Sequence, residues 1–136
     1  MIYGIGIDLV ENERVEKIID KWGDKFLQRV FSEKEIEYCA KHAQAFIHYA
    51  ARFAAKESFL KALGIGLGMG VKLREVEVSR DERGKPSLIL HGEAEQQAKK
   101  KDINRIHISL THTRKDSMAF VILEKNSSNS KNFTWA

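Results

Sequence analysis

The sequence has little of what marks secreted, membrane-spanning or repetitive proteins. A single cysteine, Cys39, among 136 residues rules out a disulfide within the chain and favours a reducing compartment. No apolar run reaches the roughly 18 residues of a transmembrane helix, and no internal repeat is present. The N-terminus carries no basic leader and meets an acidic residue at Asp8, so we expect no signal peptide. These absences predict a cytoplasmic protein that does not enter a membrane.

The residues that are present describe one globular domain. Hydrophobic residues make up 43% of the chain and charged residues 31%, a balance that argues against intrinsic disorder. The length suits a single domain, which we place at residues 1–124, followed by a polar, flexible tail at 125–136. The net charge of +4 suits an anionic partner, whether nucleic acid, phosphorylated cofactor or acidic protein, but solubility alone would also account for it.

Hydrophobic periodicity predicts an α+β fold. Residues 45–63 are rich in alanine and free of glycine and proline, so they form the longest predicted helix, which Gly64 ends. Helices cluster early and paired strands late, so we expect helices packed on a small antiparallel sheet. The predicted order is a strand at 2–10, helices at 12–22, 32–43 and 45–63, strands at 71–79 and 87–92, a helix at 93–101, and strands at 105–112 and 117–124.

Asp8 is the first residue that suggests chemistry. It lies in the first predicted strand, on the face that it shares with Gly4 and Gly6. Glycines remove side-chain bulk, so another part of the molecule can approach the backbone beside this carboxylate. A carboxylate in that position can bind a hard cation through oxygen. Position alone favours the simpler role of capping the helix that follows.

Glu57 is unusual because it lies on the apolar stripe of the longest predicted helix. It follows Phe53 by four residues and precedes Leu60 by three. A carboxylate that faces the core is unfavourable unless it is paired, hydrogen-bonded or bound to a metal. Lys61, one turn later, and Arg52, just over one turn earlier, can both reach it. A structural salt bridge therefore stands beside a metal site as an explanation.

Three further segments carry groups that suit phosphate binding. The glycine run at 64–70 matches neither a Rossmann fingerprint nor a P-loop, so it is either a helix stop with a connector or a loop whose amides approach a phosphate. Two cations, Arg83 and Lys85, lie in a predicted tight turn. Residues 109–113 (SLTHT) lie where a strand ends, and no spacing typical of a Ser/His/Asp triad or a His/Cys metal site is present.

In chain order these segments resemble the holo-acyl-carrier-protein synthase family of phosphopantetheinyl transferases. The most specific part is the RFAAKE-x-x-x-KA segment following GIGxD, and the similarity spans about residues 1–124. Ser58, Leu110 and the glycine-rich loop depart from the family pattern without touching its metal ligands. The resemblance rests on GIGID at 4–8, Arg14, RFAAKESFLKALGIG at 52–66, RGKP at 83–86 and SLTHT at 109–113.

The resemblance implies a reaction and an assembly. The reaction is the transfer of 4′-phosphopantetheine from coenzyme A to a serine of an acidic apo-acyl carrier protein, releasing adenosine 3′,5′-bisphosphate and serving fatty acid biosynthesis. The assembly is a homotrimer of the 4′-phosphopantetheinyl transferase fold, with an active site at each subunit interface. Asp8 and Glu57 match ligands of Mg²⁺, for which Mn²⁺ can substitute. Lys61 matches a lysine near the transferred phosphate and completes the catalytic set.

The resemblance also implies two binding surfaces. One contacts the carrier protein through Arg14 on the first helix, and a looser alignment extends it to Lys21, Lys25, Phe26 and Arg29. The other binds coenzyme A, and His112 lies near its nucleotide. The residues matched to that site are Arg52, Lys61, Gly64, Arg83, Gly84, Lys85, Pro86, Ser109, Thr111, His112 and Thr113.

A shared metal site would also explain why a carboxylate lies on an apolar stripe, because a divalent ion offsets its desolvation. The group that takes the serine proton stays open among Asp8, Glu57 and a metal-bound water. Two other classes of protein fit less well. A nucleic-acid-binding domain accounts for the basic pI, but no RNP, helix-turn-helix or zinc signature is present, so we expect no nucleic-acid partner. A noncatalytic relative is not expected to keep Asp8, Glu57 and Lys61 together.

Overall fold

A computed structural model describes residues 1–66 and 69–126 of the chain. Of the predicted tail at 125–136, Lys125 ends the last strand and 127–136 lie outside the described residues. The elements in chain order are β1 (Ile2–Glu11), α1 (Asn12–Trp22), α2 (Asp24–Val30), α3 (Glu33–Ala40), α4 (Ala45–Leu63), the 3₁₀ turn η1 (Leu73–Glu75), β2 (Val76–Arg80), β3 (Pro86–Leu90), α5 (Gly92–Lys100), β4 (Ile103–His112) and β5 (Asp116–Lys125).

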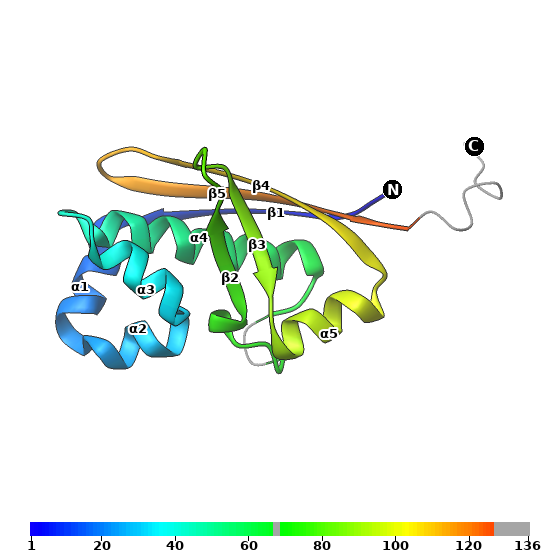
Figure 1. Cartoon of the computed structure of the whole chain (residues 1–136), viewed down its shortest axis with the longest axis horizontal. Coiled ribbons are helices and arrows are strands. Elements are labelled where there is room, and N and C mark those ends of the chain that lie inside the picture. The colour runs from blue at the N-terminus through cyan, green and yellow to red at the C-terminus, as the bar shows by residue number, and fades with distance from the viewer. Residues whose placement is uncertain (67–68, 127–136) are drawn as a thin grey trace.

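The fold is α+β, as predicted, but its strands form two sheets. One is a three-stranded antiparallel sheet in the order β1-β5-β4, and the other is the antiparallel pair β2-β3. Figure 1 shows α4 lying beneath the three-stranded sheet, with α1, α2 and α3 gathered at one end and β2, β3 and α5 toward the other. No helix in the described part is long and apolar enough to cross a membrane.

The helix α4 is the centre of the core. Its bounds are those predicted from the sequence, and Gly64 ends it in the left-handed conformation at φ 83°. Its alanines let β1, β5 and α1 approach closely, so it is buried on nearly every side rather than on one stripe. Phe59, Leu60 and Leu63 of this helix are fully buried in one cluster with side chains of the strands, which include Val76, Val121 and Leu123.

Two glycines fix how β1 lies against α4. A Cβ at Gly4 would overlap the carbonyl oxygen of Ala62, and a Cβ at Gly6 would overlap that of Ser58. The strand therefore packs directly on the helix backbone, as the bare glycine face predicted. The Ser58 hydroxyl donates a hydrogen bond of 3.0 Å to the carbonyl of Ala119, which joins the same turn of α4 to β5.

Three predictions of secondary structure were wrong. The helix α2 was missed, because Gly23 at φ 54° breaks the helical pattern and only seven residues follow before the next break. The helix α3 ends at Ala40, earlier than predicted. Residues 71–75 are not strand, because the carboxylate of Glu75 accepts the amide of Lys72 at 2.8 Å and folds that stretch into η1.

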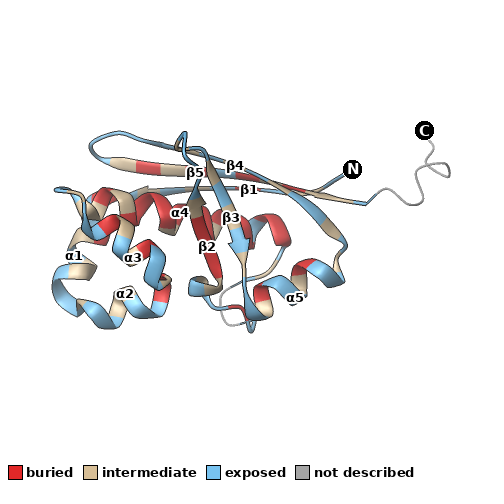
Figure 2. Ribbon diagram, in the orientation of Figure 1, coloured by how far each residue is buried: buried red, intermediate tan, exposed pale blue. Residues whose placement is uncertain are grey.

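The face of the three-stranded sheet turned away from α4 is uncovered and apolar. Alternate residues of β1 point outward, and Ile5, Ile7 and Leu9 are 54, 53 and 63% exposed. Phe120, paired with Ile7 in the neighbouring strand, is 38% exposed. Figure 2 shows the exposed colour along β1, in contrast to the buried helix beneath it. Contiguous apolar residues on an open face of a sheet are typical of a protein interaction surface.

Candidate active site

The structure brings together three residues that the sequence singled out. Asp8 and Glu57 line one cleft of about 270 Å³ between β1, α1 and α4. Lys61 donates a hydrogen bond of 3.0 Å to the Asp8 carboxylate and another of 3.1 Å to the carbonyl of Ile7. Asp8 does not cap α1, whose N-cap residue is Glu11. Within the described residues Glu57 forms no salt bridge, so the structural alternative for this acid is removed.

The electrostatics of the cleft suit a divalent cation. Burial raises the pKa of Glu57, the nearby charge of Asp8 raises it further, and Lys61 only partly opposes both. Two carboxylates that repel each other in a half-buried cleft form an all-oxygen donor set, which is the chemistry that Mg²⁺ prefers. No group of three or more His, Cys, Asp and Glu with metal-site geometry occurs in residues 1–66 and 69–126. A hard cation that binds two carboxylates and keeps water or phosphate ligands is consistent with such a site.

The residues matched to a carrier-protein contact lie beside the acidic pair. Arg14 and Phe26 line the same cleft as Asp8 and Glu57. A second cleft, of about 690 Å³, adjoins the first through Ile18 and Phe26 and is also lined by Trp22, Lys25 and Arg29. Lys21 lies over the ring of Trp22 at 5.2 Å. A groove therefore runs from the acidic pair along α1 and α2 between basic and aromatic side chains.

The RGKP segment is a tight turn joining β2 to β3. The Asp81 carboxylate accepts the backbone amides of Arg83 and Lys85, both at 2.9 Å, and Gly84 adopts φ 84°. The side chains of Arg83 and Lys85 are exposed, and Pro86 begins β3. The turn is preorganised by the backbone and leaves both cations free to bind an anion.

The SLTHT segment ends β4 and turns into β5. Ser109 and Thr111 lie on the uncovered face of the sheet, and β5 separates their strand from β1. The Thr113 hydroxyl accepts the amides of Lys115 and Asp116 and so closes the hairpin. Within one described chain Ser109 and Thr111 therefore point to the face of the sheet opposite Asp8, whereas His112, two residues from Leu110 in the alternation, lies on the same face as Asp8.

Arg52 lies in the first half of α4, and Gly64 caps the C-terminal end of this helix. Gly64 ends the helix and is exposed. Arg52 is only 2% exposed, and its guanidinium carbon lies 4.2 Å from the centre of the Tyr38 ring. It forms no ion pair with Glu57, because the two side chains leave α4 in different directions.

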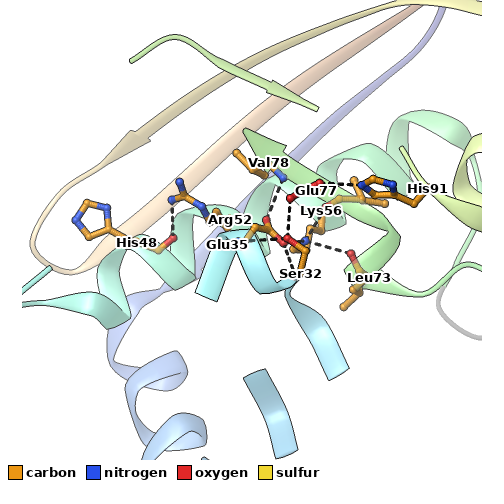
Figure 3. A network of polar contacts seen from close by, with 10 residues as sticks. Ser32, Glu35, His48, Arg52, Lys56, Leu73, Glu77, Val78 and His91 are labelled. Carbon is orange, nitrogen blue, oxygen red and sulfur yellow. Dashed lines mark hydrogen bonds and ion pairs between the residues drawn. The ribbon is translucent and has the colours of Figure 1, made fainter. Parts of the chain in front are cut away.

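Sequence reasoning missed a buried charge network behind the cleft (Figure 3). The Lys56 ammonium donates to the Glu35 carboxylate at 2.7 Å and to the carbonyls of Leu73 and Val76 at 3.2 and 2.6 Å. Both side chains of the ion pair are 0% exposed. Burial lowers the pKa of Lys56, although the Glu35 charge opposes this. All three ammonium protons are used, so Lys56 fixes the rotation of α4 that aims Glu57 at the cleft.

The network continues to a second acid. Glu77 accepts hydrogen bonds from the Ser32 hydroxyl at 2.9 Å and from His91 at 2.8 Å. Burial acts to raise the pKa of Glu77, but these hydrogen bonds and the charge of His91 outweigh it and leave that pKa lowered. The only sequence signal for this network was the capping box of Ser32 and Glu35, which the structure confirms.

Comparison with known proteins shows which family the chain resembles. The family model of the 4′-phosphopantetheinyl transferase superfamily matches residues 4–111. A holo-[acyl-carrier-protein] synthase of Syntrophus aciditrophicus is 56% identical over 124 residues, which cover 91% of this chain and 97% of that protein.

Two solved structures share the fold. The holo-[acyl-carrier-protein] synthase of Neisseria meningitidis has a TM-score of 0.85 at 32% identity, over 92% of this chain and 100% of that one. The Bacillus anthracis synthase, solved in complex with CoA (3′,5′-ADP), has a TM-score of 0.77 at 36% identity, over 93% and 99%. The extent of these matches, together with the paired acids and lysine, places the chain in the holo-[acyl-carrier-protein] synthase family of phosphopantetheinyl transferase enzymes.

Proposed function

We propose that this enzyme transfers 4′-phosphopantetheine from coenzyme A to a serine of apo-acyl carrier protein. The products are holo-acyl carrier protein and adenosine 3′,5′-bisphosphate, and the reaction serves fatty acid biosynthesis in the cytoplasm. The observation that carries the proposal is the pairing of Asp8 and Glu57 in one cleft, with Lys61 hydrogen-bonded to Asp8, in a chain that belongs to this family. The relative solved with CoA supports coenzyme A as the donor.

The residues of the cleft divide the work between them. Asp8 and Glu57 would hold Mg²⁺, or Mn²⁺ in its place, and the ion supplies charge stabilisation to the phosphate that undergoes substitution. Lys61 is 56% exposed in its side chain, so it can leave Asp8 and turn toward a phosphate oxygen. The two carboxylates are also acceptors for the serine proton within the cleft. Catalysis then depends mainly on the positioning of the two substrates and on the stabilisation of negative charge on the phosphate.

The carrier protein would dock on the groove along α1 and α2. An acidic helix complements Arg14, Lys25 and Arg29, and the apolar floor at Ile18, Trp22 and Phe26 accepts its hydrophobic side chains. Opposite charges speed such an encounter, and salt weakens it. The groove leads to Asp8 and Glu57, so a serine at the end of a docked helix would meet the paired acids.

We infer that three copies of the chain complete the coenzyme A site. The uncovered face of β1, β5 and β4 offers a continuous apolar surface for a second copy, and closed cyclic assembly would cover it in all three chains. Ser109 and Thr111 lie on this face, away from the cleft of their own chain, so contact between copies can bring them to a neighbour's cleft. Light scattering should give a trimeric mass, and Leu9→Asp should lower it to that of a monomer.

The transfer is tested directly by mass spectrometry. Incubation with coenzyme A, Mg²⁺ and apo-acyl carrier protein should increase the carrier mass by one phosphopantetheine group, and removal of the metal with EDTA should abolish the increase. Asp8→Ala and Glu57→Ala should fold and lose activity, whereas Glu82→Ala, at an exposed acid outside the cleft, should keep it. No mass increase at saturating substrate would refute the proposed function.

A further inference from the structure

A groove between α2 and η1 is lined by cations that form no ion pair in the described chain. Its volume is about 560 Å³, and we call it the α2–η1 groove. Arg29, Lys72 and Arg74 line it, and all three are exposed. None of the three pairs with an acid of residues 1–66 and 69–126. Exposed lysines on other helices do pair with an acid one turn earlier, as Lys17 does with Glu13.

The floor of the α2–η1 groove is apolar, and its η1 wall is held in place by hydrogen bonds. Val30 and Val71 lie on the floor, and each is only 6% exposed. The Glu75 carboxylate accepts the backbone amides of Lys72 and Glu93 at 2.8 and 3.1 Å. A wall that is already ordered loses little entropy when a partner binds. The groove therefore suits an acidic segment that also carries apolar side chains.

The helix α2 separates this groove from the one along α1 and α2, which we call the docking groove. Arg29 lines both grooves, whereas Lys25 and Phe26 line the docking groove and Gln28 and Val30 line the α2–η1 groove. One straight helix cannot lie on both sides of α2. A partner that fills both grooves must therefore place two separate segments, one on each side of this helix.

The charge of the surface changes just past the α2–η1 groove. The next cleft, of about 420 Å³, shares Gln28 and Arg74 with it but is also lined by Glu33 and Glu37. Both acids are exposed, so they would repel an acidic segment that extended beyond Arg74. The basic stretch is thus limited to the distance from Arg29 to Arg74. That limit suits a short acidic segment of a protein and not a long polyanion such as nucleic acid.

We propose that the carrier protein straddles α2, and that a second acidic segment of it, separate from the serine-bearing helix, binds Arg29, Lys72 and Arg74. This inference rests on the proposed function and adds η1 to the surface that binds the carrier. Carboxylates of the segment pair with the three cations, while its apolar side chains meet Val30 and Val71. A helix held only in the docking groove could slide along α1, whereas contact on both sides of α2 fixes its register. Exposed charge pairs of this kind contribute mainly to the choice and orientation of the partner.

Reversal of charge on η1 tests the contact. The double variant Lys72→Glu/Arg74→Glu replaces two attractions by two repulsions, so KM for the carrier protein should rise by about 30-fold at low salt. KM for coenzyme A and kcat should stay unchanged. The control Lys99→Glu/Lys100→Glu changes the net charge by the same amount on α5, away from both grooves, and should raise KM by less than about threefold. Melting curves establish that each variant is folded.

Cross-linking locates the segment that binds. A carbodiimide joins a lysine amine to a neighbouring carboxylate by an amide bond with loss of water, and mass spectrometry identifies the joined peptides. The reaction uses the native enzyme with apo-acyl carrier protein and no coenzyme A, so that no transfer occurs. Lys72 should be joined to an acid outside the serine-bearing helix, whereas Lys25 in the docking groove should be joined to an acid on that helix.

The outcomes separate this inference from the proposed function. A rise in KM for the carrier alone, together with this pattern of cross-links, supports it. An unchanged KM, an equal rise in the control variant, or a cross-link from Lys72 to the serine-bearing helix overturns it while leaving the transfer reaction intact. A change of oligomeric mass in Lys72→Glu/Arg74→Glu with KM unchanged also overturns it, by assigning the groove to a second copy of the chain. If the native protein transfers no phosphopantetheine, the proposed function fails, and the second contact fails with it.

Discussion

The contact between Gly6 and α4 predicts that a single methyl group will disturb both stability and catalysis. In Gly6→Ala the new Cβ would overlap the carbonyl oxygen of Ser58 and crowd the amide of Ala62. Neither group can turn aside, because both belong to the helix backbone. The strand β1 must therefore move off the helix by a distance on the order of an ångström to restore a normal contact.

The expected magnitudes follow from that displacement. Overpacking of this kind destabilises a core by roughly 1–3 kcal/mol, so we expect about 2 kcal/mol and a fall of about 7 °C in the melting midpoint. Asp8 lies two residues along the displaced strand, and a shift of this size in a catalytic group lowers the rate by about 100-fold. Thermal unfolding at fixed protein concentration and steady-state transfer kinetics measure the two effects.

A matched substitution controls for the loss of glycine flexibility. A Cβ at Gly66 would meet no atom of residues 1–66 and 69–126 within 4 Å, and this glycine does not adopt a positive φ, so Gly66→Ala should leave stability nearly unchanged. If Gly6→Ala unfolded within about 0.5 kcal/mol of the native protein and kept its turnover, the direct packing of β1 on α4 would be refuted.

Three further predictions concern the buried network and the docking groove. Glu35→Gln or Lys56→Met alone should lower the free energy of unfolding by about 3–5 kcal/mol. The double variant should lose less free energy of unfolding than the sum of the two single losses. If urea denaturation gave a loss equal to that sum, the pairing of Glu35 with Lys56 would be contradicted. The pKa of Glu77 is below its ordinary value of 4.5, so its contribution to stability is complete above that pH and is lost as the pH falls through the folded-state pKa. The urea midpoint of the native protein should therefore fall more steeply from pH 5 to pH 3 than that of Glu77→Gln. The control variant Glu82→Gln should show the same slope as the native protein. Parallel curves for all three proteins would contradict the lowered pKa of Glu77. Arg14→Ala should raise KM for the carrier protein by about tenfold with little change in coenzyme A affinity, whereas Lys17→Ala on the same helix should not; a selective loss of coenzyme A binding would place Arg14 elsewhere.

The parts of the fold that the sequence predicted well are those encoded by near neighbours. The bounds of α4 follow from an uninterrupted run of helix formers and a glycine stop. The capping box at Ser32 and Glu35 needs only three residues of spacing. The bare face of Gly4 and Gly6 likewise indicated a close approach, though not which element approaches.

The parts that were missed depend on groups far apart in the chain. Lys56 lies within a predicted helix, but its partners Glu35, Leu73 and Val76 come from three other segments. The stacking of His42 on His48 depends on the path of the turn between α3 and α4, which no local pattern specifies. The main sheet depends on the pairing of β1 with β5, which brings together residues more than 100 positions apart in the chain.

The order of strands in the main sheet has a consequence for synthesis of the protein. β5 is the last element of the described chain, yet it lies in the centre of the sheet and pairs with both β1 and β4. During translation β1 leaves the ribosome first and must wait for more than 100 residues before its hydrogen-bonding partner is available. Contacts so distant in sequence form slowly, and until they form the apolar side chains of β1 stay open to other nascent chains. Asp8 on β1 is therefore held in place only when the chain is nearly complete, so a product that stops before β5 would lack an ordered active site.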